Sequence, residues 1–231
     1  MTIIAARLQA VRSRIDAAAT AAGRSPADIR LIAVSKTFPA AAIADAHAAG
    51  QNAFGENYLQ EALGKMATLS ELGLEWHFIG PIQSNKTRQI AEQFQWVHGV
   101  DRLKIAERLS FSRPANLPPL QICIQVNVSG EDSKSGVRPD EVLALAKAVC
   151  PLPRTRLRGL MAIPEPTPDT GLQRSCFRLL RQLRDDIVSR GVALDTLSMG
   201  MSDDLEAAIA EGATLVRVGR AIFGERPSPS R

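Results

Sequence analysis

Aromatic residues are scarce in this sequence. Phe, Trp and Tyr make up only 4% of the 231 residues, whereas 45% are hydrophobic. The core must therefore be built mainly from Ala, Leu, Ile and Val. This argues against proteins that bind nucleic acids by stacking bases on aromatic side chains along a basic groove.

An excess of charge of one sign is also missing. The 28 Lys and Arg residues face 24 Asp and Glu residues, which leaves a net charge of +4. The densest basic stretch, residues 174–190, is interrupted by Asp185 and Asp186, which is typical of a solvated helix face. We therefore expect no nucleic-acid partner.

Cysteines are few and apolar runs are short. The three cysteines are odd in number and far apart, so neither a disulfide framework nor a metal site is expected, and a reducing compartment is indicated. The N-terminus has charges within its apolar pattern and no small-residue cleavage site, unlike a signal peptide. No apolar run approaches the ~20 residues of a membrane span. We expect a cytoplasmic protein without membrane contact.

The chain instead shows a repeating alternation of short apolar segments and helical patterns. Ile4, Leu8, Val11 and Ile15 share one helical face, so an N-terminal helix is expected over residues 1–22. Eight strands are expected at 29–36, 52–57, 74–80, 96–100, 120–127, 157–163, 196–200 and 214–219. Helices are expected at 39–49, 58–72, 84–94, 101–110, 139–149, 170–190 and 203–211.

This pattern predicts an α/β fold, a single (β/α)8 TIM barrel with an extra N-terminal helix. Most of the strand segments are apolar throughout, as in parallel strands that helices cover. Eight repeats within about 200 residues favour a closed barrel over an open doubly wound sheet. No Gly/Ser linker divides the chain. We expect one domain over residues 1–231, with a flexible tail at 225–231 and no second β domain.

In such a barrel, the reactive groups lie at the carboxyl ends of the strands and in the loops that follow them. Lys36 ends an apolar strand, LIAVSK, so its amine would face the barrel mouth. There it would lose hydration, its pKa would fall, and the neutral amine could form a Schiff base with a carbonyl group. The alternative is an ordinary strand-end lysine that reaches solvent.

The loops after the last two strands, at 198–202 and 218–224, suit a phosphate group. Barrels often bind phosphate there through backbone N–H groups, and Gly200 and Gly219 would let the backbone approach an anion closely. The adjacent Asp203 and Asp204 should then point away from it. The alternative is a pair of tight turns. A lysine opposite a phosphate cradle is what pyridoxal 5′-phosphate (PLP) requires.

Three further residues have weaker signals. Arg217, within the last strand, could donate a hydrogen bond to a pyridine nitrogen and keep it unprotonated, or it could form an ion pair with Glu225. His77 lies mid-strand, which favours a satisfied core histidine over a general base. Lys134 lies in a polar segment, 130–137, expected to form a mobile loop over the mouth, and a solvated lysine is favoured.

Several stretches together are similar to the pyridoxal phosphate homeostasis protein family, whose barrel is alanine-racemase-like (PLP fold type III). They are AVSKT (33–37), FGENYLQEA (54–62), WHFIGPIQSNK (76–86), SGEDSKSGV (129–137), GLMAIP (159–164), SMGMSDDLEAAI (198–209) and VRVGRAIFG (216–224). The resemblance implies that Lys36 forms a Schiff base with PLP, that Asn57 lies near the ring and that Arg217 faces the pyridine nitrogen.

The resemblance further implies that the phosphate is bound by Ser198, Gly219 and the backbone amide of Arg220. The family commonly has threonine at this last position, so a hydroxyl contact is lost. The guanidinium could contact the phosphate instead or turn to solvent.

The resemblance also implies a role in intracellular PLP (vitamin B6) and amino-acid homeostasis, by holding or delivering the cofactor without established catalysis. PLP-dependent apo-enzymes are possible recipients, and a monomer is expected. The alternative is a weak PLP-dependent amino-acid racemase. Two-base racemisation needs a second acid/base group, and the only tyrosine is Tyr58. A third candidate is a Schiff-base aldolase without a cofactor.

Overall fold

Eight parallel strands close into a barrel in chain order in the computed structural model, which describes residues 2–130 and 135–225. The strands are β1 (Arg30–Val34), β2 (Ala53–Glu56), β3 (Glu75–Phe78), β4 (Trp96–Val100), β5 (Leu120–Gln125), β6 (Thr155–Met161), β7 (Thr196–Ser198) and β8 (Leu215–Val218). The expected (β/α)8 barrel is confirmed, and each strand begins and ends within two residues of its expected bounds.

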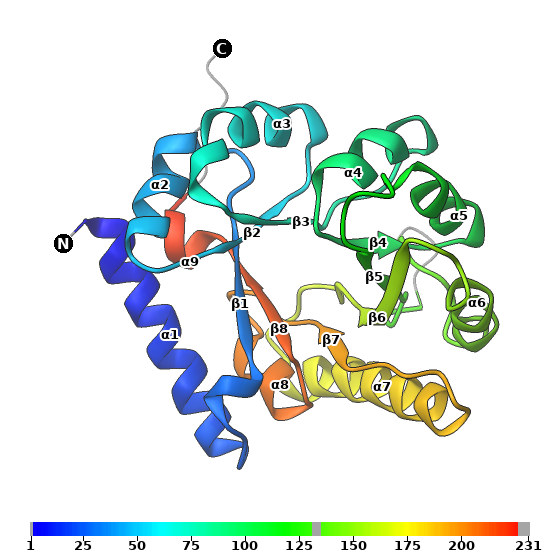
Figure 1. Cartoon of the computed structure of the whole chain (residues 1–231). Coiled ribbons are helices and arrows are strands. Elements are labelled where there is room, and N and C mark those ends of the chain that lie inside the picture. Colours follow the sequence, from blue (N-terminus) through cyan, green and yellow to red (C-terminus); the bar gives the residue numbers. More distant parts are fainter. Residues whose placement is uncertain (1, 131–134, 226–231) are drawn as a thin grey trace.

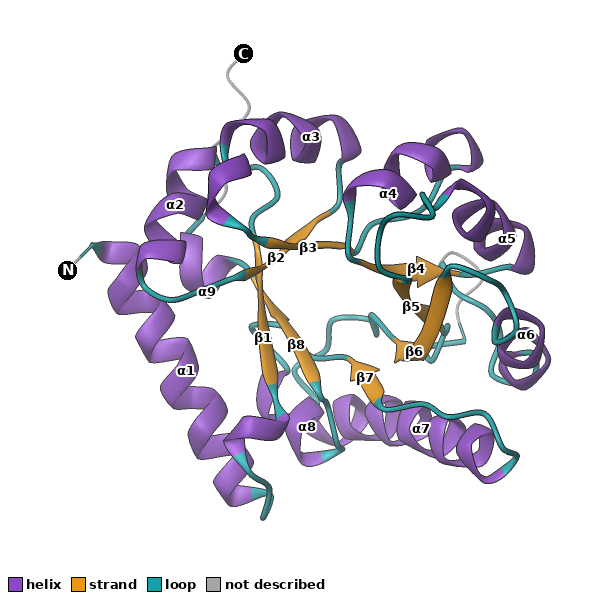
Figure 2. Ribbon diagram, viewed as in Figure 1, coloured by secondary structure: helices purple, strands orange, loops and turns teal. Residues whose placement is uncertain are grey.

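Helices surround the strands on the outside of the barrel (Figure 2). They are α1 (Ile3–Ala21), α2 (Ala40–Ala48), α3 (Leu59–Thr68), α4 (Thr87–Gln93), α5 (Leu103–Ser112), α6 (Val142–Val149), α7 (Thr170–Ser189), α8 (Leu205–Ala210) and α9 (Arg220–Phe223). Three 3-10 turns lie at Pro26–Asp28, Ser70–Leu72 and Ser84–Lys86. The described residues thus contain every helix expected from the sequence.

Pairing between the first and last strands closes the barrel. In β1, Ala33 pairs with Phe54 of β2 on one side and with Val218 of β8 on the other. Because parallel strands all point the same way, their carboxyl ends meet at one mouth. Lys36, Asn57 and the loops after β7 and β8 are therefore brought to the same end of the molecule.

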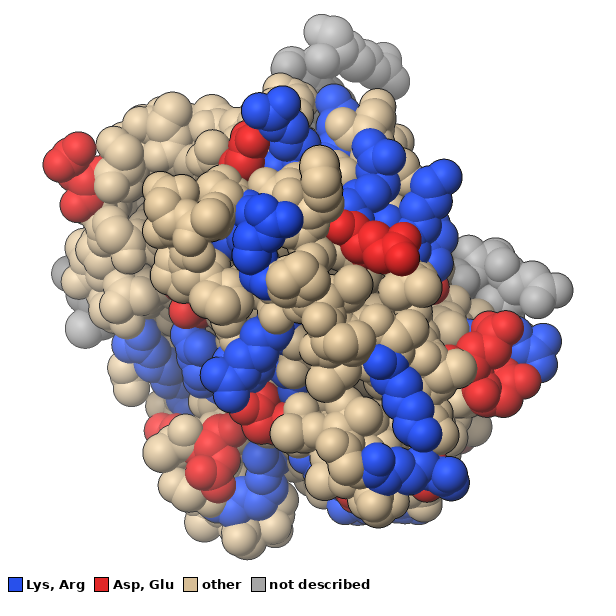
Figure 3. Space-filling model, turned by 45° about the vertical axis from the view of Figure 1, so that its right-hand side comes forward, with Lys and Arg blue, Asp and Glu red and all other residues tan. Residues whose placement is uncertain are grey.

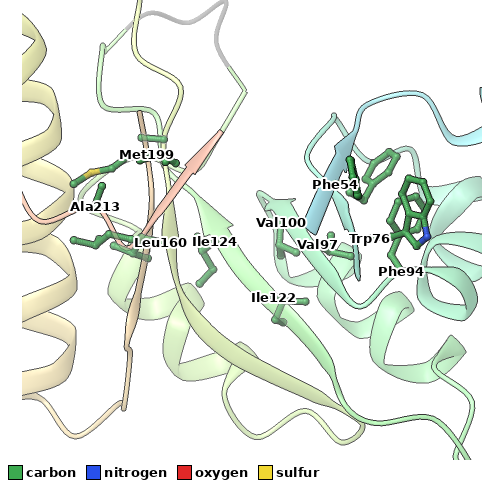
Figure 4. Packing of buried hydrophobic residues seen from close by; sticks show 14 of the residues in the cluster. Phe54, Trp76, Phe94, Val97, Val100, Ile122, Ile124, Leu160, Met199 and Ala213 are labelled. Carbon is green, nitrogen blue, oxygen red and sulfur yellow. The ribbon is translucent and has the colours of Figure 1, made fainter. Parts of the chain in front are cut away.

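Alternate residues of each strand face outward or inward. Outward side chains such as Phe54, Val97 and Leu160 pack beneath the helices (Figure 4). A separate inward cluster fills part of the barrel interior with Ile32, Trp96, Cys123, Met161 and Leu215. Helix-covered strands need apolar residues on both faces, which explains why the strand segments are apolar throughout.

Helix α1 lies against the outside of the barrel, beside β1, in Figure 1. Leu8, Val11 and Ile15 are buried, which confirms the face expected from their spacing. Thr2 caps the helix by accepting a hydrogen bond from the Ala5 amide. The helix is therefore part of the packed fold.

Two details differ from the expectation. The helix expected over residues 58–72 ends at Thr68, and a separate 3-10 turn follows it. The expected loop 218–224 contains α9, a helix too short for sequence periodicity to reveal. It forms because Ile222 and Phe223 are buried, and the Phe223 ring stacks on Phe38 with centroids 5.2 Å apart. The tail beyond Glu225 and Lys134 lie outside the described residues.

The contact between β6 and β7 depends on a glycine. Gly159 pairs with Thr196, and a Cβ atom at position 159 would lie 1.8 Å from the Thr196 carbonyl oxygen. We expect Gly159→Ala to lower the free energy of unfolding by about 3 kcal/mol or more, since the backbone must shift. Chemical denaturation followed by circular dichroism would measure this loss.

Gly64→Ala provides the matched control. Gly64 is exposed within α3, and nothing lies within 4 Å of the added Cβ. Alanine is the better helix former, so this variant should gain about 1 kcal/mol. Equal stability of the two variants would contradict the assignment of a tight contact to Gly159.

Candidate functional site

A cavity of about 920 Å³ opens at the carboxyl end of the strands. Loops that follow six of the eight strands contribute to its lining. Residues expected at the site that line it are Lys36, Asn57, Arg217, Gly219 and Arg220. A smaller cavity, about 280 Å³, lies at the opposite end and contains none of them.

The loop that carries Lys36 is held on both sides of the lysine. The Ser35 hydroxyl donates to Glu56 Oε1 at 2.6 Å, and the Thr37 amide donates to Glu61 Oε1 at 2.6 Å. Thr37 has a φ of 69°, which is unusual for a β-branched residue. The backbone around Lys36 is thus fixed by contacts with β2 and α3.

A second lysine organises these two carboxylates. Lys65 Nζ donates to Glu56 Oε1 at 2.7 Å, to Glu61 Oε1 at 2.5 Å and to the Ser35 carbonyl at 2.8 Å. An ammonium group has three N–H donors, so all three are used. The side chain is 7% exposed. Lys65 therefore holds the loop of Lys36 and has no donor left for a ligand.

Glu56 is the least satisfied member of this cluster. Its side chain is fully buried, and Oε2 has no hydrogen-bond partner within the described residues. Burial raises the pKa of Glu56, although Lys65 and Ser35 oppose the rise. The carboxylate depends on Lys65 for its counter-charge. The sequence analysis missed this cluster, whose only local signal is the four-residue spacing of Glu61 and Lys65.

Arg217 enters the cavity floor from β8. One guanidinium nitrogen, Nη1, donates to Ser198 Oγ at 2.6 Å, and Nη2 donates to the Ala162 carbonyl at 2.8 Å. The residue is 3% exposed. Burial lowers its pKa to about 10, which leaves it protonated at neutral pH. Arg217 forms no ion pair with Glu225 in the described structure, so the ion pair considered as the alternative role of Arg217 is not adopted.

Ser198 lies elsewhere than expected. Its residue is fully buried, its hydroxyl contacts Arg217 and lies 2.8 Å from His98 Nδ1, and it is not among the residues that line the cavity. It pairs with Leu215, at the beginning of β8, and so sits deep in the barrel. The phosphate contact expected for Ser198 stays a prediction. Ser202 of the same loop lines the cavity, and the sequence analysis missed it.

The two expected phosphate loops approach the cavity closely. Gly200 has a φ of 94°, and an added Cβ would lie 2.6 Å from Ala208 Cβ. At Gly219 an added Cβ would lie 3.1 Å from the Val34 carbonyl oxygen. Larger residues would thus crowd both turns. The amides at the beginning of α9 have no partner within the helix, as at any helix start.

Asp203 and Asp204 are among the residues that line the cavity, and their orientation away from a bound phosphate stays a prediction. Asp203 pairs with Arg220 at 2.5 Å, and Asp204 Oδ1 accepts a hydrogen bond from the Met201 amide at 2.5 Å. Burial raises the pKa of Asp204. Asp203 thus forms an exposed ion pair, whereas Asp204 is bound to the backbone of its own loop.

Other residues weighed in the sequence are placed as follows. His77 is fully buried and hydrogen-bonded, which confirms a satisfied core histidine. Tyr58 is 54% exposed and is not among the cavity-lining residues. The expected solvated face of α7 has partly exposed arginines, which share a buried carboxylate, Glu211. No cluster able to hold a metal ion occurs among the described residues.

Comparison with known proteins identifies the family. The family model of the alanine racemase N-terminal domain matches residues 6–227. The pyridoxal phosphate homeostasis protein of Pseudomonas aeruginosa is 66% identical over 226 residues, which cover 98% of this chain and 97% of that protein. That of Escherichia coli K12 is 56% identical over 229 residues and covers 98% of each chain. The chain belongs to the pyridoxal phosphate homeostasis protein family.

A solved structure supports the same placement. PipY of Synechococcus elongatus PCC7942, solved with PLP bound, is 39% identical and superposes with a TM-score of 0.85. The match covers 96% of this chain and 100% of PipY. The resemblance noted in the sequence motifs is therefore confirmed for the family and for its alanine-racemase-like barrel.

The surface carries charges of both signs. On the face shown in Figure 3, basic and acidic side chains are interspersed. Within residues 2–130 and 135–225, no helix has both the length and the apolar content that crossing a membrane would require.

The Lys65 cluster makes a testable contribution to stability. We expect Lys65→Met to lower the free energy of unfolding by about 3–5 kcal/mol at neutral pH, because it leaves Glu56 charged and buried without a counter-charge. The loss should shrink as the pH falls. Protonation of a carboxyl group whose folded-state pKa is raised stabilises the folded state. Denaturant titrations between pH 5 and pH 8 would measure both effects.

Arg88→Met is the matched control, because Arg88 and Glu92 form an exposed pair with the same four-residue spacing. Exposed pairs contribute little, so no measurable change is expected. A loss at Lys65 that is as small as the loss at Arg88, or that is independent of pH, would contradict this account of the cluster.

Proposed function

We propose that this chain binds PLP as a Schiff base on Lys36 and acts in intracellular PLP (vitamin B6) and amino-acid homeostasis. The observation that carries the proposal is that Lys36, Arg217 and Gly219 line one cavity at the carboxyl end of the barrel. When bound, PLP supplies an aldehyde that condenses with a primary amine, together with a pyridine ring and a phosphate group. Its binding by PipY supports the proposal.

The residues that line the cavity have the chemistry needed to bind PLP. Lys36 supplies the amine, on a backbone held by Glu56, Glu61 and Lys65. Arg217 supplies hydrogen-bond donors only, which suits an unprotonated pyridine nitrogen. Asn57 Oδ1 is buried and has no partner in the described chain, so it is an acceptor available to a group that enters the cavity.

For the phosphate we propose the turns of Gly200 and Gly219, with Ser202 and the backbone amide of Arg220. The glycines let the two turns pack closely against Ala208 and Val34, since a side chain at either position would crowd these neighbours. The Arg220 guanidinium is held by Asp203. We propose that on binding this guanidinium turns from Asp203 to the phosphate. It then replaces the contact of the threonine hydroxyl that is common at this position in the family.

We propose that the chain holds or delivers PLP and does not turn over amino acids. Two observations support this. Tyr58 is mostly exposed and is not among the lining residues, so the expected candidate for a second acid/base group does not face the cavity. Asp203 is paired with Arg220, and Asp204 accepts a hydrogen bond from the Met201 amide. PLP-dependent apo-enzymes are the recipients that this role would require.

We propose that the chain acts as a monomer. The three cysteines remain free thiols, in keeping with a reducing compartment, and we propose a cytoplasmic site of action without a nucleic-acid or membrane partner.

Lys36→Ala tests the binding residue. After loading with PLP and reduction with borohydride, peptide mass mapping should place a pyridoxyl group on Lys36 of the unaltered chain. The variant should lose the absorbance of the covalent link, and its affinity for PLP should fall by at least about tenfold, since it retains only non-covalent contacts. Lys147→Ala, an exposed position on α6, should behave like the unaltered chain. Full absorbance in Lys36→Ala would overturn the assignment.

A chirality assay tests the absence of turnover. The PLP-loaded chain is incubated with L-alanine, and the D-enantiomer is measured over time against free PLP at the same concentration. We expect no conversion above free PLP, because Tyr58, the candidate second acid/base group, is not among the residues that line the cavity. Conversion that disappears in Lys36→Ala would instead support the racemase alternative. A purified protein that is colourless and takes up no PLP would favour the aldolase alternative.

A further inference from the structure

A continuous series of hydrogen-bonded side chains crosses the barrel interior behind Arg217. Arg217 Nη1 donates to Ser198 Oγ at 2.6 Å, and this hydroxyl lies 2.8 Å from His98 Nδ1. His98 Nε2 is 3.0 Å from His77 Nδ1, and His77 Nε2 is 2.6 Å from Glu75 Oε1. The series therefore joins a cation at the cavity to a carboxylate on the first residue of β3.

The members of this series differ in their access to water. His77, His98 and Ser198 are fully buried. The Glu75 side chain is 32% exposed, and its Oε1 accepts a hydrogen bond from Arg30 at 2.7 Å. The middle of the series is thus shielded from solvent. Its Glu75 end reaches solvent at the end of the barrel opposite the cavity.

The positions of the protons follow from the chemistry of the two ends. A guanidinium only donates, so Ser198 Oγ accepts from Arg217. A carboxylate only accepts, so His77 Nε2 must carry hydrogen. Hydrogen bonds from His77 and Arg30 outweigh the effect of burial and hold the pKa of Glu75 below its ordinary value, which keeps Glu75 a carboxylate.

Both rings are fully buried, and burial lowers the pKa of His77 and, more strongly, that of His98, which favours a neutral imidazole in each. A neutral imidazole has one N–H group. With hydrogen on Nε2, His77 accepts at Nδ1 from His98 Nε2–H. His98 then accepts at Nδ1 from the Ser198 hydroxyl. All four hydrogen bonds therefore donate in the same direction, from Arg217 towards Glu75.

We propose that the four side chains behind Arg217 form a one-directional relay that orients its guanidinium and supports its charge from a carboxylate at the opposite end of the barrel. No carboxylate in the described chain hydrogen-bonds to Arg217, yet the residue is almost fully buried. Aligned dipoles that present oxygen to a buried cation offset part of its desolvation. Ser198, His98, His77 and Glu75 are thus positioning residues.

The relay also determines which donors face the cavity. Of the five N–H groups of a guanidinium, one is taken by Ser198 and one by the Ala162 carbonyl. These two contacts fix the plane of the group, so its other N–H groups point in fixed directions. This part of the inference rests on the proposed function, in which Arg217 donates to the pyridine nitrogen of PLP.

Nitrogen NMR of histidine-labelled protein, without added PLP, tests the proton positions. We expect His77 and His98 to show protonated Nε2 and unprotonated Nδ1 from pH 6 to pH 8. His47 is an internal control, for which we expect a protonated Nδ1 and an unprotonated Nε2. Its Nδ1 lies 3.2 Å from the Gln51 carbonyl oxygen, which can only accept a hydrogen bond. A proton on Nδ1 of His77 or of His98 would overturn the relay.

Variants of Glu75 test the positioning role. Glu75→Leu removes the final acceptor, so His77 should become a mixture of tautomers, and the affinity for PLP should fall about fivefold, as for one weakened hydrogen bond. Glu75→Gln retains an acceptor oxygen and should keep the tautomers and an affinity within about twofold. Peptide mapping should still find the pyridoxyl group on Lys36 in both variants.

Asp195→Leu is the matched control. Asp195 also pairs with an arginine, Arg158, and immediately precedes β7 as Glu75 begins β3, but it is outside the relay. Removal of this carboxylate should leave the tautomers of His77 and His98 and the affinity for PLP unchanged. An equal fall in affinity for Asp195→Leu and Glu75→Leu, or none for either, would overturn the positioning role. Expected tautomers in an unaltered chain that fails to bind PLP would support the relay and overturn the proposed function.

Discussion

The interior of a closed barrel excludes water, and this constraint governs the whole molecule. A polar group that points inward must find its partner among other inward-pointing groups, since unpaired polar atoms are costly there. In this chain, Trp96, Ile32 and Met161 fill part of the interior with apolar atoms. Arg217 and His98 are surrounded by hydrogen-bond partners. A cavity of about 920 Å³ lies at the carboxyl end, where Lys36 follows β1.

The two lysines near that mouth illustrate how position determines role. Lys65 is almost completely buried and uses all of its donors on the chain itself. Lys36 follows β1 directly and lines the cavity. The same side chain thus acts as a structural cation in one place and as the proposed binding group in the other. Lys65 stabilises the loop on which Lys36 stands, so its effect on the cofactor would be indirect.

Much of the fold could be predicted from the sequence, because strand-by-strand alternation and uninterrupted apolar segments are strong local signals. The same signals located Lys36, Asn57 and Arg217 at strand ends. The depth of a residue within the barrel could not be predicted, because it depends on the stagger between strands. Ser198 ends β7, yet it is level with Leu215 at the beginning of β8, and its hydroxyl therefore joins the interior. Contacts such as that of His77 with His98 join strands twenty-one residues apart and have no local signal.

The backbone conformation of Thr37 is strained, and this residue restricts the loop that carries Lys36. A β-branched residue at a φ of 69° is strained by roughly 1–2 kcal/mol, and glycine would adopt the same conformation freely. Glycine would also let the loop sample many more shapes. Threonine restricts the backbone to fewer conformations, and the hydrogen bond from its amide to Glu61 stabilises the observed conformation. The backbone that carries Lys36 is thereby ordered before any ligand arrives, so the entropy of ordering this loop is lost during folding and not during binding.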